Sequence, residues 1–301
     1  MKNQFTNLDT ERRNPDTMNL DQLSTVDILA KINNEDKKVA KAIELQLESI
    51  ANLVDAASAA YSKGGRIIYM GAGTSGRLGI LDASECPPTF GVEHEDFTAL
   101  IAGGQSAMFK AVEGAEDHGK YGVKDLKEIN ITSKDFVIGL AASGRTPYVI
   151  GALEYANSLG CGTGSIACVT TSELSKVAKY PVDVPVGPEA ITGSTRMKAG
   201  TAQKLVLNMV SSTIMIKAGK VYENLMVDVT TSNEKLVDRA ARIVSEVVGC
   251  EMDKAMKLLN ESEMDVKLAI LKGITGCDNK ECQELLDKNN NNIAKTIRSV
   301  K

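Results

Sequence analysis

Tryptophan is absent from this sequence, histidine occurs twice, and aromatic residues make up 4% of its 301 residues. So few aromatic side chains argue against a surface on which nucleic-acid bases stack. Lysine and arginine number 35 against 39 aspartates and glutamates, so the net charge is −4. A protein that coats nucleic acid needs a strong basic footprint, and this sequence lacks one. Nucleic acid is therefore not an expected partner.

The sequence also lacks the patterns of metal sites, disulfide frameworks and membrane segments. The two histidines are His94 and His118, and no Cys-x-x-Cys pair occurs among the six cysteines, which stand at positions 86, 161, 168, 250, 277 and 282. We therefore expect neither a zinc site nor disulfides. No run reaches the ~20 apolar residues of a membrane helix, and the N-terminus shows no secretory signal. We expect a cytoplasmic protein that does not bind membranes.

The composition that remains, 43% hydrophobic and 25% charged residues, is typical of a globular protein. Short apolar runs, each followed by Gly, Ser or Thr, alternate with segments of helical spacing such as residues 148–159. The runs cover residues 66–70, 98–102, 136–142, 165–169 and 182–186. This alternation predicts an α/β fold with a five-stranded parallel sheet flanked by helices.

Four other segments surround these strands. The first ~30 residues are polar and predict an extended arm, and residues 35–62 carry the spacing of one amphipathic helix. Residues 201–216 are apolar on nearly every side, which predicts a helix buried in the domain or against a partner subunit. From Asn233 onward the strand patterns stop, and we expect a small helical domain.

The loop after the first predicted strand, residues 71–76, reads Gly-Ala-Gly-Thr-Ser-Gly. Its usual interpretation is a dinucleotide site of an oxidoreductase. Thr74 and Ser75, however, supply hydroxyl groups suited to a terminal phosphate. A dinucleotide site also needs an acid after the second strand, where Gly103 and Gly104 stand instead. A phosphate site is the favoured hypothesis.

A second loop, residues 142–147, follows the third predicted strand and contains Ser143, Gly144 and Thr146. Pro147 fits the first turn of the next helix. Backbone amides, hydroxyl groups and a helix N-terminus together form an anion site. Two such loops on neighbouring strands suit one phosphomonoester better than a pyrophosphate. The alternative is that both are only turns and helix caps.

A third segment, residues 187–200, again places hydroxyl groups before a predicted helix. Ser194 lies in it, and Arg196 and Lys198 add positive charge. The alternative is a capped helix with solvated basic residues.

Two carboxylates are candidates for acid–base catalysis. Glu85 lies in a predicted helix that the Pro87-Pro88 pair should end, and Glu116 lies in the acidic segment 113–117. Two carboxylates from different segments can divide the roles of base and acid at a phosphosugar. For either one alone, a solvated surface position is the alternative.

Four strings resemble the N-acetylmuramic acid 6-phosphate etherase family, and the resemblance extends over nearly the whole chain. They are GAGTSGRLG at 71–79, the DASECPPTF that follows, GPEAITGSTRMKAG at 187–200 and KVYENLMVDV at 220–229. The third string also resembles a signature of the glucokinase regulatory proteins. Two positions depart from the family pattern: Glu223 stands where glycine is expected, and His118 stands where a variable or acidic residue is expected.

The resemblance implies a Rossmann-like sugar isomerase (SIS) domain at residues 57–220, preceded by an arm and helix at 1–56. It also implies a C-terminal helical region at 221–301, similar to a ubiquitin-associated (UBA) bundle, and a homodimer. The family cleaves the D-lactyl ether of N-acetylmuramate 6-phosphate during cell-wall sugar recycling. The products are N-acetylglucosamine 6-phosphate and D-lactate. No metal or organic cofactor is implied.

By the same resemblance, Glu85 matches the proton donor to the departing lactate and Glu116 the base at the second sugar carbon, with the division of roles left open. The residues expected to bind the phosphosugar are Gly73, Thr74, Ser75, Ser143, Gly144, Thr146, Ser194 and Lys198. Two alternatives remain on this fold: a phosphosugar sensor without activity and a sugar-phosphate isomerase.

Overall fold

The computed structural model describes residues 9–229 and 233–300. These residues form two compact units. The first contains the described residues up to Ser84 together with Glu95–Ser211. The second contains Glu85–His94 together with the described residues from Ser212 onward. The second unit is therefore built from two separate stretches of sequence.

The first unit holds a five-stranded parallel sheet with the order β2-β1-β3-β4-β5. The strands are β1 (Ile67–Gly71), β2 (Phe97–Ile101), β3 (Phe136–Leu140), β4 (Gly162–Ala167) and β5 (Tyr180–Asp183). The predicted sheet is confirmed. However, β4 begins at Gly162 rather than at 165, because its first residues are glycines and a threonine with no apolar pattern. Gly164 is needed there, since a Cβ would lie 2.7 Å from Leu53 Cδ1.

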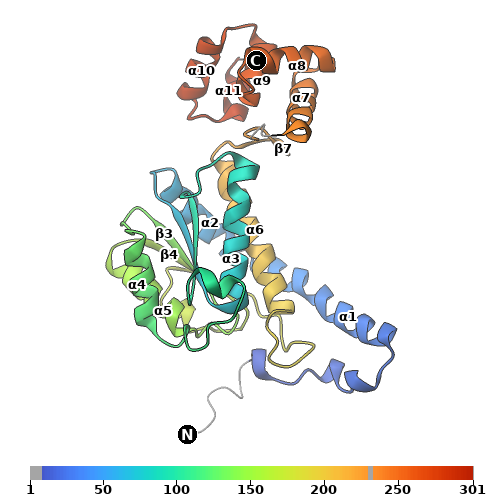
Figure 1. Cartoon of the computed structure of the whole chain (residues 1–301), viewed down its shortest axis with the longest axis vertical. Helices are drawn as coiled ribbons and strands as arrows, with labels where there is room; N and C mark the ends of the chain where they lie inside the picture. Colours follow the sequence, from blue (N-terminus) through green and yellow to red (C-terminus); the bar gives the residue numbers. More distant parts are fainter. Residues whose placement is uncertain (1–8, 230–232, 301) are drawn as a thin grey trace. The chain divides into compact units, whose positions relative to one another are not determined.

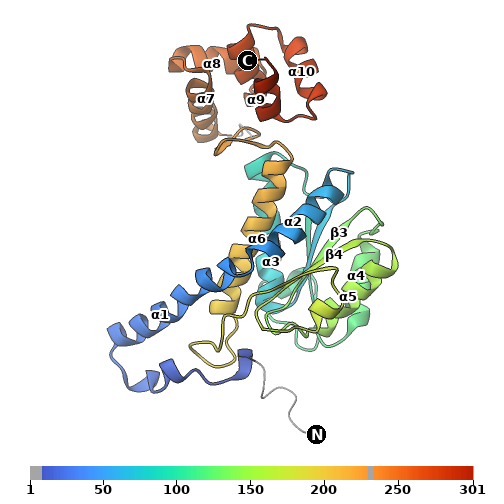
Figure 2. The ribbon, with the colours of Figure 1, turned by 180° about the vertical axis from the view of Figure 1, so that it is seen from behind.

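Helices cover both faces of this sheet (Figures 1 and 2). On one face lie α4 (Gly119–Glu128) and α5 (Pro147–Ser158). On the other lie α2 (Leu47–Tyr61), α3 (Gly73–Phe90) and α6 (Lys198–Lys217). The central strands β1 and β3 are buried throughout, as the continuous apolar runs predict for a sheet covered on both sides.

The single helix predicted over 35–62 is wrong, because the segment contains two helices. Helix α1 (Thr25–Glu44) ends at the C-cap Leu45, and α2 begins at Leu47. The start at Thr25 is set by Ser24, whose side chain accepts a hydrogen bond from the Asp27 amide at 3.3 Å. The first turns of α1 carry no buried residue, so the apolar spacing appears only from Val39 onward.

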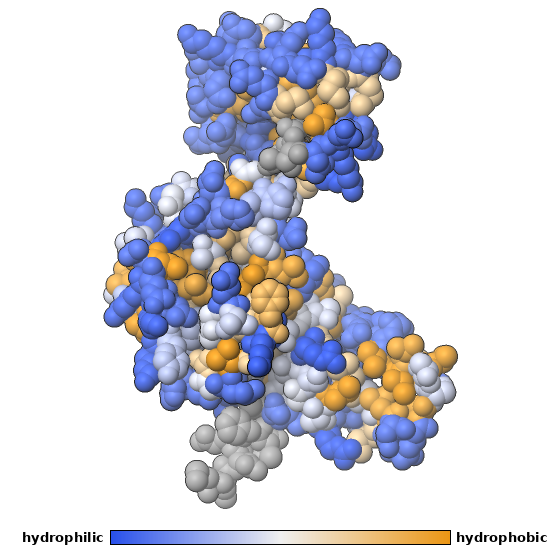
Figure 3. Space-filling model, viewed as in Figure 1, coloured by the Kyte–Doolittle hydropathy of each residue, from blue (hydrophilic) through white to orange (hydrophobic). Residues whose placement is uncertain are grey.

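The start of α1 exposes apolar side chains instead of burying them. Val26 is 75% and Leu29 60% exposed. Figure 3 shows hydrophobic surface at the lower right, where α1 and the preceding turns lie in Figure 1. A patch of this kind marks an interaction surface more often than a monomer surface.

The N-terminal arm is not extended, which corrects the prediction for its described part. It forms the 3₁₀ turns η1 (Asp9–Glu11), η2 (Pro15–Thr17) and η3 (Leu20–Gln22). The Asn14 side chain donates to the Pro188 carbonyl at 3.0 Å, and the Thr17 hydroxyl donates to the Ala190 carbonyl at 2.9 Å. The arm is therefore bonded to the segment that precedes α6.

The prediction that Pro87 and Pro88 end their helix is also wrong, because α3 continues to Phe90 with both prolines inside it. A proline lacks its own amide but keeps its carbonyl as an acceptor. The Gly91 amide donates to the Pro87 carbonyl at 2.9 Å, and Gly91 leaves the helix at φ +59°.

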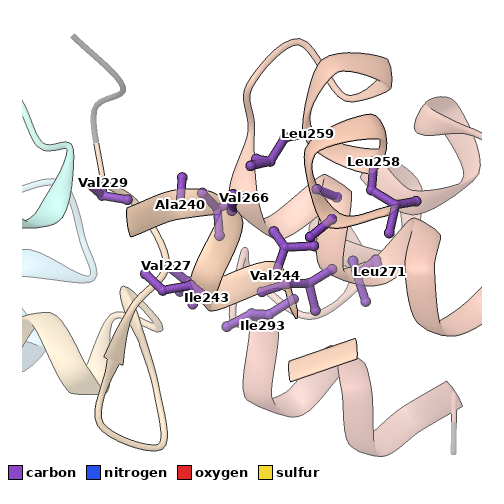
Figure 4. Close-up of a cluster of buried hydrophobic side chains, with 14 of the residues drawn as sticks. Val227, Val229, Ala240, Ile243, Val244, Leu258, Leu259, Val266, Leu271 and Ile293 are labelled. Carbon is purple, nitrogen blue, oxygen red and sulfur yellow. The ribbon is translucent and has the colours of Figure 1, made fainter. Parts of the chain in front are cut away.

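The second unit contains a hairpin, β6 (Val221–Tyr222) and β7 (Leu225–Met226), which the sequence did not predict. Its helices are α7 (Glu234–Val248), α8 (Met252–Glu261), α9 (Val266–Thr275), α10 (Asn279–Lys288) and α11 (Ile293–Val300). Their apolar faces share one core, shown in Figure 4, with Val244, Leu259 and Ile293 fully buried. The predicted helical character of this segment is confirmed.

Within the described ranges, no helix has the length and apolar character needed to cross a bilayer.

Candidate active site

The first loop predicted to bind phosphate, residues 71–76 (called the first phosphate loop below), connects β1 directly to α3. A Cβ on Gly76 would lie 2.6 Å from Ile101 Cγ1 and 2.8 Å from the Gly71 carbonyl oxygen, so only glycine permits the helix to start this close to the sheet. The first amides of a helix have no acceptor within it. The amides of Gly73, Thr74 and Ser75 are therefore available to an anion, and their role in binding phosphate stays a prediction.

The hydroxyl groups predicted to hold phosphate differ in their surroundings. Ser75 is buried, and its hydroxyl donates to Gln203 Oε1 at 2.8 Å. Thr74, Ser143 and Thr146 are half-buried, and their hydroxyls have no protein partner among the described residues. The latter three hydroxyls are available to a ligand, whereas Ser75 has its backbone amide to offer.

The second loop is supported from behind by the segment after β4. Gly144 has φ +68°, and a Cβ there would lie 2.2 Å from the Ser172 Cβ. Leu174 donates its amide to the Gly144 carbonyl at 3.1 Å, and the Ser172 hydroxyl donates to Asp183 at 2.9 Å. Thr146 is the N-cap of α5 and Pro147 its first residue, which confirms the predicted helix start.

The third segment meets α6 in a different way, because a carboxylate already caps this helix. Glu189 is 1% exposed and accepts hydrogen bonds from the amides of Lys198 and Ala199, both at 2.9 Å. The first amides of α6 are therefore occupied by protein. Sequence analysis did not single out Glu189, although it is the acid nearest to this helix start. Ser194 is half-buried in the turn before α6.

Lys198 is 1% exposed, and its Nζ lies 2.6 Å from Glu35 Oε2. Lys38 reaches the other oxygen of the same carboxylate at 2.6 Å. Burial alone would raise the pKa of Glu35, but hydrogen bonds from Lys198, Lys38 and Asn14 outweigh it and lower that pKa to about 2. A phosphate contact would require Lys198 to leave this pair, so its predicted binding role stays a prediction.

Glu116 lines a cavity of about 150 Å³ in the first unit. The cavity is also lined by Gly73 of the first phosphate loop and by Arg77 in the second turn of α3. The Glu116 carbonyl accepts the Tyr148 amide at 3.0 Å, which bonds this segment to the first turn of α5. The structure thus brings Glu116 together with Gly73 and with the helix that follows Ser143.

Three glycines determine how close Glu116 comes to α5. Gly119 and Gly122 on α4 face α5, where a Cβ on Gly151 would lie 2.5 Å from the Gly119 Cα. A Cβ on Gly122 would lie 2.2 Å from the Tyr148 carbonyl oxygen. Because α4 begins immediately after the acidic segment, this close helix packing fixes the position of Glu116.

Glu116 keeps an exposed surface, but the protein around its carboxyl group removes part of the surrounding water and raises its pKa, and the neighbouring charges of Asp117 and Glu113 raise it further. A carboxyl group whose pKa lies nearer to neutrality exchanges protons more readily at the pH of the cell. His118 follows as the N-cap of α4 and is exposed, with its ring edge-on to Tyr121 at 5.5 Å.

Glu85 lies about three turns after Gly73 along α3 and is exposed; it is not among the residues that line the cavity. One turn earlier, Asp82 is 5% exposed and accepts hydrogen bonds from Tyr69, Asn208 and Ser211. Asp82 holds α3 to β1 and α6, a role that sequence analysis missed. The sequence pattern that could have revealed this role is an aspartate at a position where the helix presents its apolar face.

Comparison with known proteins identifies the domain. Residues 49–157 match the N-terminal SIS domain of glucokinase regulatory protein, and residues 109–212 match the SIS domain. The crystal structure of a candidate phosphosugar isomerase involved in capsule formation, from Bacteroides fragilis, has the same fold with a TM-score of 0.50 and 16% identity. That similarity covers 65% of this chain and 94% of the other.

Two bacterial relatives extend the match beyond the domain. The N-acetylmuramic acid 6-phosphate etherase of Clostridium botulinum is 56% identical over 291 residues, which cover 97% of this chain and 96% of the relative. That of Cronobacter sakazakii is 57% identical over 261 residues, covering 87% and 88%. The resemblance found in the motifs is confirmed, and the chain belongs to the N-acetylmuramic acid 6-phosphate etherase family.

Proposed function

We propose that the chain cleaves the D-lactyl ether of N-acetylmuramate 6-phosphate, as a step in the recycling of cell-wall amino sugars. The products are N-acetylglucosamine 6-phosphate and D-lactate. The observation that carries the proposal is the position of Glu116, which lines one cavity with Gly73 and is bonded through its carbonyl to the start of α5. A base therefore lies beside the two loops suited to a sugar phosphate.

The reaction begins when the sugar ring opens to an aldehyde, which makes the hydrogen on the second carbon acidic. Glu116 removes that proton, and the electrons of the C–H bond form a double bond between the second and third carbons. The ether bond at the third carbon breaks, and lactate leaves with a proton supplied by an acid. Water then adds across the double bond, with its oxygen on the third carbon and a proton on the second.

We assign the base role to Glu116 and the proton-donor role to Glu85. The raised pKa of Glu116 supports its assignment, since burial and the adjacent acids move it toward the working pH. Glu85 is exposed on α3, so it is accessible to solvent protons. Its assignment rests on its match to the family motif.

The phosphate is assigned to the two loops. Thr74, Ser143 and Thr146 offer hydroxyl groups without protein partners among the described residues, and Gly73 and Ser75 offer backbone amides. The Gly144 amide donates to the Ala141 carbonyl at 2.9 Å, so we place Gly144 in the set for the shape it gives this loop. We place Ser194 and Lys198 in the binding set on the family match alone.

We further propose a cytoplasmic homodimer. None of the six cysteines forms a disulfide, as is usual in proteins of reducing compartments. The exposed apolar residues of α1, Val26 and Leu29, provide a surface for a second copy of the chain.

The decisive experiment measures lactate release from N-acetylmuramate 6-phosphate in water enriched in ¹⁸O, with a chelator present. We expect stoichiometric D-lactate and one heavy oxygen on the third carbon of the sugar product. Aldose–ketose interconversion without lactate would identify a sugar-phosphate isomerase. Binding of N-acetylglucosamine 6-phosphate without turnover of either kind would identify a sensor.

A further inference from the structure

The cavity beside Glu116 contains two acids and, among the lining residues that the structure describes, a single cation. Glu113 and Glu116 contribute the acids, and Arg77 contributes the cation from the second turn of α3. The proposed reaction uses Glu116 and the phosphate loops but leaves Arg77 without a role.

Arg77 is held in a fixed orientation by the turn η4 (Gln105–Met108). Its Nε donates to the Met108 carbonyl at 2.8 Å, and its Nη2 donates to the Ala107 carbonyl at 2.7 Å. Both bonds use the side edge of the guanidinium group. The end edge, formed by Nη1 and the second hydrogen of Nη2, has no acceptor in the described part of the chain. An edge of this kind binds a carboxylate through two parallel hydrogen bonds.

We propose that Arg77 binds the carboxylate of the substrate's lactyl group and so selects the muramate over the glucosamine sugar. This inference rests on the proposed function, because only that substrate class brings a carboxylate to the third carbon. The third carbon adjoins the one that Glu116 deprotonates, so the carboxylate must come close to that base. An anion placed beside Glu113 and Glu116 needs a compensating cation, and Arg77 lines the same cavity.

The same contact also favours release of the sugar product. Before the ether bond breaks, the carboxylate is tethered to the sugar and both are held at once. Afterwards the sugar product lacks the anion, so it loses the contact with Arg77 and dissociates more easily. Arg77 is thus a specificity-determining residue, while Glu85 and Glu116 transfer the protons.

The test compares two ligands on Arg77→Met. We expect the Kd for N-acetylglucosamine 6-phosphate to stay within about twofold of the parent value. The KM for N-acetylmuramate 6-phosphate should rise about ten- to a hundredfold, the range expected for a lost charge-assisted hydrogen bond. The matched control is Lys110→Met, which removes an exposed cation outside the cavity, and it should change neither value by more than twofold.

Equal weakening of both ligands in a folded Arg77→Met protein would overturn the proposal, since Arg77 would then only hold η4 or bind phosphate. If that variant does not fold, the test is made on the unaltered protein. Its affinity for the substrate is compared with its affinity for an analogue whose lactyl carboxylate is replaced by a carboxamide. We expect about tenfold weaker binding of this analogue, and equal binding would again overturn the proposal. An unaltered protein that releases no lactate refutes the proposed function instead, because the comparison of the substrate with its carboxamide analogue measures binding and does not depend on turnover.

Discussion

Glu116 shares its short segment with two other acids, and their charges raise its pKa. As a base, Glu116 must be deprotonated, so activity should fall when the pH drops below that raised pKa. We predict that Glu113→Gln and Asp117→Asn each move the acidic limb of the kcat/KM profile to lower pH, because each removes a like charge. The profile measured over pH 4–8 checks this.

Glu128→Gln is the matched control for this prediction. Glu128 is an exposed acid on α4 paired with Lys124, so its removal should leave the acidic limb in place. An acidic limb of the kcat/KM profile that moves to higher pH, or that moves by the same amount in all three variants, would contradict a local charge effect on Glu116.

The buried pair of Glu35 and Lys198 should contribute strongly to stability. Removing one partner leaves an uncompensated buried charge, which costs about 3 kcal/mol or more. We therefore predict that Lys198→Met lowers the free energy of unfolding by at least about 3 kcal/mol in urea denaturation. Lys38→Met removes the half-exposed partner of the same carboxylate and should cost less than about 1 kcal/mol.

The same carboxylate predicts how stability depends on pH. Because folding lowers the pKa of Glu35 from its usual 4.5 to about 2, its contribution is complete above pH 4.5 and is lost as the pH falls toward 2. Glu35→Gln should flatten the stability curve in that window. If the free energy of unfolding falls equally in the variant and in the unaltered protein between pH 4.5 and 2, other acidic residues control the loss of stability at low pH.

At the scale of elements, the contact between α4 and α5 leaves little space for an added side-chain atom. A methyl group on Gly122 would press into the Tyr148 carbonyl, which belongs to the first turn of α5. We predict that Gly122→Ala costs about 1–3 kcal/mol of stability and also lowers kcat/KM, because it displaces the start of α4 and with it Glu116. Glu154→Ala on the exposed face of α5 is the control and should change neither.

The β6–β7 hairpin contains a residue in an unfavourable conformation. Glu223 has φ +54°, where glycine is free of the steric cost that other residues bear. We predict that Glu223→Gly raises the free energy of unfolding by up to about 1 kcal/mol, seen as a higher Tm without loss of activity. A lower Tm would show that the glutamate side chain stabilises this turn more than its backbone strains it. The departure from the family pattern at Glu223 thus coincides with a backbone position suited to glycine.

Elements with strong local patterns could be predicted from the sequence. The buried strands and the start of α5 at Pro147 follow from apolar runs and a proline, which are local signals. The early start of α1 could not be predicted, because its first turns have no core to face. The hairpin was missed because each strand has two residues, too few to show a period.

At the scale of the whole molecule, the contacts that join distant segments carry no sequence pattern. Asn14 bonds to Pro188, 174 residues later in the sequence, and Glu35 bonds to Lys198, 163 residues later. The motif positions of Glu116 and the two phosphate loops were predicted, but the caps and pairs around them were not. The spacing of apolar residues along the sequence indicates which residues share a face of one helix or strand. These partners come from different elements, and only the tertiary fold brings them together.

Thiol labelling tests the two units together. Cys161 and Cys168 are fully buried in the first unit and Cys282 in the second, whereas Cys250 and Cys277 are half-buried. We predict that only Cys250 and Cys277 react quickly with an aromatic disulfide reagent in the native protein. Mass spectrometry of the labelled peptides identifies the sites, and fast labelling of Cys161 or Cys168 would contradict the buried sheet. Labelling in rising urea then follows each unit separately.

The segment 85–94 gives the second unit an unusual genetic property. A Cβ on Gly91 would lie 2.5 Å from the Asp228 carbonyl oxygen, so this segment is packed inside the unit although it is encoded far upstream of it. Recombination near codon 212 would transfer the later helices without it. The later helices alone therefore do not make up the complete second unit. Recombination cannot exchange this unit without also carrying part of the coding sequence of the first unit.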